Sequence, residues 1–299
     1  MNHTKEIPWF IDLHMHSACS DGSDNIPQLL ANLKKHQVKI FSLTDLDTIS
    51  GCMEIKKMLP EDLIFIPGVE FSCINEIGAC HILGYGYDDK SEAIHSVVQH
   101  GKTLRQTRLT AHLKHLEEAH GIIISKEEKD YLFSLDCAGK PHIARILVEK
   151  GIARNITEGI KKYINLSKEG PGKIPAKLAV EGILKADGIP VWAHPLGGES
   201  DKRLTREEFY EQFAVMKKAG IRGLECYYSR YSKEETSFLR SVALEHNLFI
   251  SGGSDYHGVN KSILLHMLNE DNEYVPAENL SILHLLCPEV ISSNTVPSI

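Results

Sequence analysis

The chain has 299 residues, of which 42% are hydrophobic, and this excludes a disordered or fibrous protein and suits one large α/β domain with an insertion. Its net charge of -7 argues against a protein that coats nucleic acid without sequence preference. The seven cysteines form no C-x-x-C pair, which argues against a disulfide framework or a cysteine zinc site. We find neither a signal peptide nor an apolar run of about 20 residues, so we expect a cytoplasmic protein without a membrane partner.

Short runs of β-branched and aromatic residues predict about seven strands. In chain order these runs are WFIDLHMH, VKIFSLTD, LIFIPGVEFS, ACHILGYGY, IPVWAHP, IRGLECYY and LFISGGSD. Helical patterns alternate with them, which favours a parallel sheet. Three helix starts are marked by capping boxes, in which a Ser or Thr is followed three residues later by Glu: Ser125 with Glu128, Thr205 with Glu208, and Ser232 with Glu235.

The middle of the chain has a different character. Between residues 90 and 177 the strand signal vanishes and helical segments with Gly-Pro turns replace it. We therefore predict a helical insertion at 90–177 in an α/β unit formed by 1–89 and 178–299. Residues 139–177 hold nine Lys or Arg against three Glu, and a basic stretch in an acidic protein indicates a local anion site. The final segment, 292–299, reads as a frayed tail.

Polar residues gather at the carboxyl ends of the predicted strands, where active sites of parallel α/β barrels assemble. His14 and His16 are two apart on one strand, so their imidazoles share a face and can converge on one metal ion. Glu70 ends an apolar strand, where an unpaired carboxylate would be costly, and it could bridge two metals. The remaining strand-end residues are Asp45, His194, Asp255 and His257. Asp21, in the turn after the first strand, can reach the same site, and His81 lies at the other terminus of its strand segment.

A lone histidine at a strand end is more often a structural group than a ligand. Seven or more ionisable groups at successive strand ends are hard to explain as core packing, because buried imidazoles and carboxylates need partners. We therefore predict a metal site. The histidines in helical or terminal settings are expected at the surface: His3, His36, His95, His100, His246 and His266.

Eight segments occur in the order found in the PHP (polymerase and histidinol phosphatase) family: DLHMHSACSDG, SLTDLDT, GVEFS, HILGY, GKPHIAR, VWAHP, ECYYSRYS and SGGSDYHG. The chain most resembles the bacterial PHP phosphoesterases that include nucleoside bisphosphate phosphatases, a 5'-3' exoribonuclease and a cyclic phosphodiesterase. The resemblance implies a distorted (β/α)7 TIM-like barrel with up to three metals, often manganese, iron or zinc.

The resemblance also implies a ligand set. The first metal would take His14, His16, Glu70 and Asp255, and the second would take Glu70, His81 and His194. The third would use Asp21, position 46 and His257, but position 46 is leucine, which has no lone pair to offer a cation. We therefore expect two divalent ions (Mn, Fe or Zn) and an incomplete third site.

An anion clamp is the second part of the resemblance. The family's G-R-P-H-x-A-R reads GKPHIAR here, so Lys140, His142 and Arg145 are predicted to hold the substrate phosphate near a helix N-terminus, where anions are favoured. A surface helix with ordinary charges is the alternative. Lys177 or Lys173 would supply a further cation. Contacts to the rest of the substrate are assigned to Arg230 and the pair Tyr227-Tyr228, and protonation of the leaving oxygen to His257 or Asp21.

The predicted activity is metal-dependent hydrolysis of a phosphate ester on a small nucleotide or sugar phosphate, cyclic phosphates included. A 5'-3' exoribonuclease acting on short oligonucleotides is the alternative within enzymes, and an amidohydrolase is a further one. A catalytically impaired regulatory module is the alternative from another class, and Leu46 is the feature that favours it. No obligate protein partner is expected.

Overall fold

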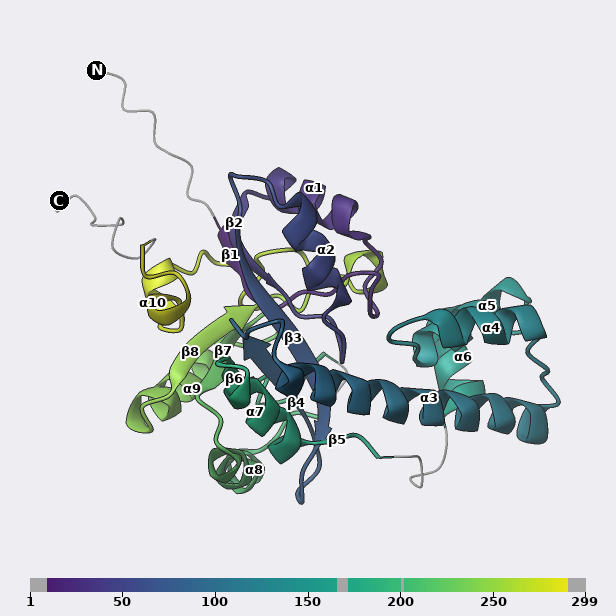
Figure 1. Ribbon diagram of the computed structural model, residues 1–299. Coiled ribbons are helices and arrows are strands. Elements are labelled where there is room, and N and C mark those ends of the chain that lie inside the picture. The colour runs from purple at the N-terminus through teal and green to yellow at the C-terminus, as the bar shows by residue number, and fades with distance from the viewer. Residues whose placement is uncertain (1–9, 166–171, 200–201, 290–299) are drawn as a thin grey trace.

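The computed structural model describes residues 10–165, 172–199 and 202–289, and shows an α/β protein with helices around a central sheet (Figure 1). All seven predicted strands are confirmed, each shorter or longer than its sequence run by a few residues. The strands are β1 (Phe10–Asp12), β2 (Val38–Leu43), β3 (Ile64–Ile74), β4 (Ala79–Tyr85), β5 (Ile174–Pro175), β6 (Ile189–Trp192), β7 (Gly223–Tyr228) and β8 (Phe249–Gly253). Strand β5, a two-residue strand paired with β3, was not predicted.

The sheet is mostly parallel, as expected, with one exception. The strands follow the order β1-β2-β3-β4-β6-β7-β8, and β4 runs antiparallel to both β3 and β6. The cause is the short turn between β3 and β4, in which the Asn75 side chain accepts hydrogen bonds from the backbone of Ile77 and Gly78. A connection this short can join only antiparallel strands, since a parallel pair needs a long crossover.

The first and last strands of this order also meet. The Leu13 N–H donates to the Gly252 carbonyl at 3.2 Å, and the His16 N–H donates to the Tyr256 carbonyl at 2.8 Å. The first bond joins the segment after β1 to β8 itself, and the second joins the segments that follow the two strands, as closure of a barrel requires. The chain thus has the α/β architecture expected, and the closed (β/α)7 barrel stays a prediction.

Six helices of the described chain flank the sheet. They are α1 (Ile26–Lys35), α2 (Ser50–Met58), α7 (Ala176–Lys185), α8 (Arg206–Ala219), α9 (Lys233–Glu245) and α10 (Leu283–Leu286), with 3-10 turns at Gly258–Asn260 and Ala277–Asn279. The capping boxes predicted for α8 and α9 are both formed, because each cap hydroxyl accepts from the N3 backbone and each N3 Glu accepts from the cap N–H. None of the helices in the described part of the chain is long and apolar enough to span a bilayer.

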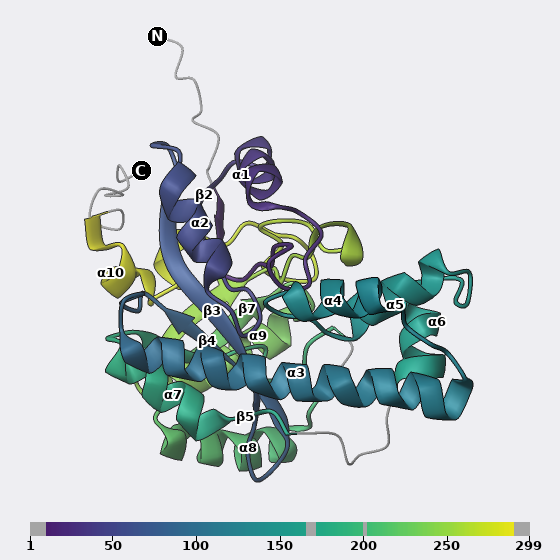
Figure 2. The ribbon, with the colours of Figure 1, turned by 45° about the vertical axis from the view of Figure 1, so that its right-hand side comes forward.

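The segment predicted as an insertion is helical. It contains α3 (Glu92–His120), α4 (Lys126–Ser134), α5 (Lys140–Glu149), α6 (Ile156–Gly159) and a π-helical turn (Ile160–Ile164), and α4 starts at the predicted Ser125 capping box. Figures 1 and 2 show α4, α5 and α6 gathered at the far end of α3, away from the sheet.

Two hydrophobic cores meet along α3. Ile94 and Val97, on its first half, belong to the main core around the sheet, whereas Leu109 and Leu116 belong to a separate core shared with α4 and α5. The long helix therefore fixes the position of the α4–α6 unit relative to the sheet. The division of the chain at residues 90 and 177 stays a prediction.

Candidate active site

The predicted metal ligands converge at one edge of the sheet. His14 and His16 follow β1, Glu70 lies in β3, His194 follows β6 and Asp255 follows β8. His81 lies near the start of β4, and because β4 is antiparallel, its start lies at the edge where the other strands end. Their ligand atoms form three groups: His14, His16 and Glu70; Glu70, His81 and His194; and His16, Asp21 and His257.

The first group places two imidazole nitrogens against carboxylate oxygens. Glu70 Oε2 lies 3.3 Å from His14 Nε2 and 3.2 Å from His16 Nε2, and Asp255 Oδ1 lies 3.2 Å from the same His16 nitrogen. Within the described part of the chain neither Nε2 atom has a hydrogen-bond partner, although both histidines are buried. Buried polar atoms are rarely left unsatisfied, so the arrangement fits a cation held between the nitrogens and the oxygens.

The tautomer of His14 strengthens this interpretation. Its Nδ1 lies 2.8 Å from Glu225 Oε1, a carboxylate that can only accept, so Nδ1 carries the proton. Its Nε2 then faces the carboxylate of Glu70. This contact needs a positive charge between the two groups, which either a second proton on the ring or a metal ion supplies. Burial lowers the pKa of His14, but Glu225 and Glu70 outweigh burial and raise that pKa well above its usual range, so a metal ion would take the place of a proton here.

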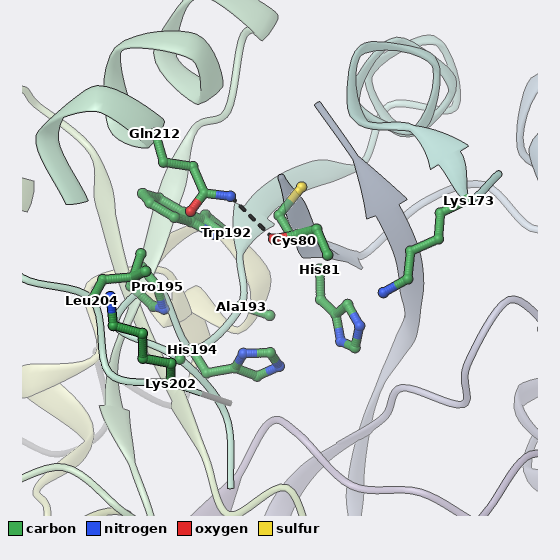
Figure 3. A pocket seen from close by; sticks show the side chains of 12 residues that line it. Cys80, His81, Lys173, Trp192, Ala193, His194, Pro195, Lys202, Leu204 and Gln212 are labelled. Carbon is green, nitrogen blue, oxygen red and sulfur yellow. Dashed lines mark hydrogen bonds between the residues drawn. The ribbon is translucent and has the colours of Figure 1, made fainter. Parts of the chain in front are cut away.

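Glu70 also serves the second group through its other oxygen. Oε1 lies 2.8 Å from His81 Nδ1 and 3.2 Å from His194 Nε2. Figure 3 shows the two rings directed toward the same space, with the ammonium of Lys173 approaching His81. One carboxylate therefore presents a different oxygen to each of two imidazole groups, which is the geometry that a bridging ligand requires.

The third group is less complete. Asp21 Oδ1 lies 3.2 Å from His257 Nε2 and 3.5 Å from His16 Nδ1, while Leu46 lines the same cavity and offers no donor atom. The sequence pointed to Asp21 and His257 here, and the structure adds the second nitrogen of His16. That imidazole already faces the first group through Nε2, and an imidazole binds two metals only when it loses both ring protons. The group is thus weaker than the other two.

Charges within the site are strongly coupled. Burial lowers the pKa of His16, but Asp255 and Glu70 outweigh burial and raise it to about 9. Burial raises the pKa of Glu70, but His81 and His14 outweigh it and hold that pKa well below its usual range. A metal ion must displace protons from these imidazoles, so its binding releases protons and weakens as the pH falls.

The backbone at the site allows two segments of the chain to approach each other closely and adopts rare conformations at two predicted ligands. Gly253 packs against His14, and a Cβ at this position would lie 2.2 Å from the Cβ of His14, so only glycine fits. His194 and Asp255 have φ values of 29° and 61°, conformations that side-chain-bearing residues rarely adopt. Strain of this kind concentrates at functional sites.

Two residues of the site were not predicted. Glu225 is fully buried in β7 and, besides its bond to His14, accepts from the His194 N–H at 2.7 Å. Our prediction considered only strand ends, whereas Glu225 lies in the middle of β7. The signal that could have identified it is a charged residue inside the otherwise apolar strand GLECYY. Lys261 donates from Nζ to Asp255 Oδ2 at 2.8 Å, and nothing in its sequence context distinguishes it from a surface lysine.

Asp45, one of the strand-end residues, orders the loop that carries Asp21. Its oxygens accept from the Ser17 N–H at 2.8 Å, the Ser17 hydroxyl at 2.7 Å and the Ser20 hydroxyl at 2.6 Å. With these acceptor positions used inside the protein, Asp45 positions the loop and does not face the metal groups.

Only part of the predicted clamp meets the metal groups. His142 and Arg145 line a cavity that Asp21 also lines. His142 Nδ1 accepts from the Gly139 N–H at 3.2 Å, which leaves Nε2–H free to donate to an anion. Lys140 donates to Asn165 at 2.9 Å on an exposed surface.

The other predicted substrate contacts are dispersed. Lys177 lies on the exposed surface of α7 with its Nζ 3.8 Å from Glu181, so of the two lysines considered it is Lys173 that the structure brings to the histidines. Arg230 donates to Glu199. Glu199 lines the cavity that Asp21, Leu46, Glu70, His81, His194, Asp255 and His257 also line, which we call the metal cavity. The Tyr228 hydroxyl donates to Asp255 at 3.0 Å, whereas Tyr227 packs beneath Arg240.

Comparison with known proteins places the chain. The model of the PHP domain family matches residues 12–172 of this chain. A 5'-3' exoribonuclease of Haemophilus influenzae is 31% identical over 82% of this chain and 89% of its own length. A 3',5'-nucleoside bisphosphate phosphatase of Chromobacterium violaceum is 28% identical over 83% of this chain and 87% of its own length. The solved structure of a proposed metal-dependent phosphoesterase from Bifidobacterium adolescentis superposes with a TM-score of 0.75 at 23% identity, over 89% of this chain and 94% of its own. Together with three groups of side chains that could hold metal ions, these matches show that the chain belongs to the PHP family and is a metal-dependent phosphoesterase.

Proposed function

We propose that this enzyme hydrolyses phosphate esters of a small nucleotide or sugar phosphate, cyclic phosphates included, at a centre of two divalent ions. The observation that carries the proposal is Glu70, whose two oxygens face two separate sets of imidazoles. Asp21 lines both the cavity beside Glu70 and the cavity of His142 and Arg145. Mixed imidazole and carboxylate ligands suit manganese, iron or zinc. Divalent ions in such a centre lower the pKa of water toward neutrality and polarise a phosphoryl oxygen.

The side chains beside the metal groups then have distinct tasks. Arg145 offers a planar fork of donors that matches a phosphate, and His142 offers Nε2–H. The partners of His257 are Asp21, 3.2 Å from Nε2, and the Asp255 carbonyl, 2.8 Å from Nδ1. We therefore propose that His257 or Asp21 protonates the leaving oxygen.

Removal of nucleotides from an oligonucleotide end is the second candidate. The exoribonuclease that is 31% identical supports it, and so does the basic stretch of residues 139–177 that carries His142 and Arg145. A polymer groove needs a longer positive track than this stretch provides, which is why we place the small substrate first. The impaired-module alternative is disfavoured because all ligands of the first two groups are present.

A substrate panel tests the proposal. We expect the Mn²⁺-loaded protein to release inorganic phosphate from nucleoside monophosphates, bisphosphates or sugar phosphates, and to lose this activity with a chelator. Short 5'-phosphorylated oligoribonucleotides are assayed in parallel for release of mononucleotides. Turnover of the oligonucleotides alone would replace our proposal by the exoribonuclease, and turnover of amides alone would replace it by an amidohydrolase.

Replacing Arg145 by alanine is expected to raise the KM for phosphorylated substrates by about tenfold to a hundredfold, the usual effect of losing a hydrogen bond to a charged group. Metal content is expected to stay unchanged, because Arg145 belongs to none of the three ligand groups and lines the adjoining cavity. The measurement is steady-state kinetics with elemental analysis of the same sample. Arg154→Ala is the matched control, since Arg154 lies in the same basic stretch, is exposed and pairs with Glu158. Loss of metal from the Arg145 variant would show that the clamp and the metal centre are not separate.

A further inference from the structure

Lys261 brings a positive charge into the metal cavity. It follows the 3-10 turn Gly258–Asn260, and its Nζ donates to Asp255 Oδ2 at 2.8 Å. Its side chain is only 24% exposed and lines the same cavity as Asp21, Leu46 and His257. A long, flexible side chain has many solvated alternatives, so its placement here reflects attraction to the carboxylates of the site.

The two oxygens of Asp255 are divided between different partners. Oδ1 lies 3.2 Å from His16 Nε2 and 3.4 Å from His257 Nδ1, on the side of the first metal group. Oδ2 accepts from Lys261 and from the Tyr228 hydroxyl at 3.0 Å. Asp255 therefore has one oxygen for a metal ion and one already satisfied by protein donors.

The ammonium lies among carboxylates. Its Nζ is in contact with Asp255, and the cavity that it lines is also lined by Asp21 and Glu70. An amine with an ordinary pKa is protonated at neutral pH, and carboxylates beside it favour the charged form. The acidic side of the cavity thus already contains a cation supplied by the protein.

We propose that the Lys261 ammonium is the resident third cation of this centre, and that together with Leu46 it keeps a third divalent ion away from Asp21 and His257. The inference rests on the proposed two-metal centre. Leu46 removes a ligand, and the ammonium adds electrostatic repulsion against a dication placed among the same carboxylates. These are two separate obstacles, so removing either one alone leaves the other in place.

Metal counting in a double-mutant cycle tests this inference. Wild type, Leu46→His, Lys261→Met and the double variant are loaded with Mn²⁺, dialysed identically and analysed for metal and protein. Methionine keeps the length of the side chain and removes its charge. We expect about two ions per chain in the wild type and in both single variants, and about three in the double variant, where the ligand is restored and the repulsion removed.

Further variants separate charge from shape. Leu46→His combined with Lys261→Arg keeps the positive charge, so we expect this protein to stay at about two ions. Lys261→Gln is a second uncharged replacement in case the methionine variant does not fold, which thermal unfolding monitors. The inference is overturned if Leu46→His alone reaches three ions, if a folded double variant stays at two, or if the wild type already holds three. Because the readout is metal content, a wild type with two ions that fails the phosphate-release panel would refute the proposed substrate and leave the assignment of Lys261 standing.

Discussion

Glu70→Gln is expected to abolish phosphate release and to remove most of the bound metal. Glu70 Oε2 lies 3.3 Å from His14 Nε2, and Oε1 lies 2.8 Å from His81 Nδ1, so this carboxylate faces both main ligand groups. Glutamine has nearly the same shape but carries no charge, and its NH₂ group would be directed at one of the two metal positions. We expect activity to fall by about a thousandfold or more, as for loss of a principal electrostatic group. Phosphate-release assays and elemental analysis measure the two effects.

The control for this substitution is Glu76→Gln. Glu76 lies in the turn that follows β3 and is exposed, so the same chemical change there is expected to alter neither activity nor metal content. Near-normal activity of the Glu70 variant, with a full complement of metal, would contradict the bridged centre. Loss of activity with metal retained would instead assign Glu70 a part in the chemical step alone.

Glu225→Gln is expected to weaken metal binding by about tenfold to a hundredfold, the usual cost of removing a partner that orients a metal ligand. Glu225 fixes the proton of His14 on Nδ1 through a 2.8 Å contact and holds the backbone of His194 at 2.7 Å. Both imidazoles are thereby oriented before any ion arrives. Competition between the protein and a chromophoric chelator for Mn²⁺ or Zn²⁺ measures the affinity.

The matched control is Glu234→Gln on α9, where the carboxylate is exposed and remote from the ligands in the sequence. We expect its metal affinity to equal that of the wild type. Thermal unfolding of the metal-free proteins separates a loss of affinity from a loss of fold. Unchanged affinity in a folded Glu225 variant would mean that this residue only fills a buried polar position and does not prepare His14.

The sequence by itself determined the features that depend on residues close together in the chain. Alternation and run length located the seven strands, and Ser-x-x-Glu or Thr-x-x-Glu spacing located the starts of α4, α8 and α9. His14 and His16 were identified because residues two apart on a strand share a face. The order of short motifs indicated the PHP family. Each strand run, capping box and motif is complete within a few residues, and the order of the motifs is read along the chain, so no tertiary contact is needed to detect these signals.

Only the tertiary structure decided which distant residues meet. The orientation of β4 placed His81 beside His194, and the register of β7 placed Glu225 against His14, 211 positions earlier in the chain. Lys261 became part of the site only because the segment after β8 returns past Asp255. Such contacts are set by strand order and register, which arise from packing the whole core, and a local pattern in the sequence carries no record of them.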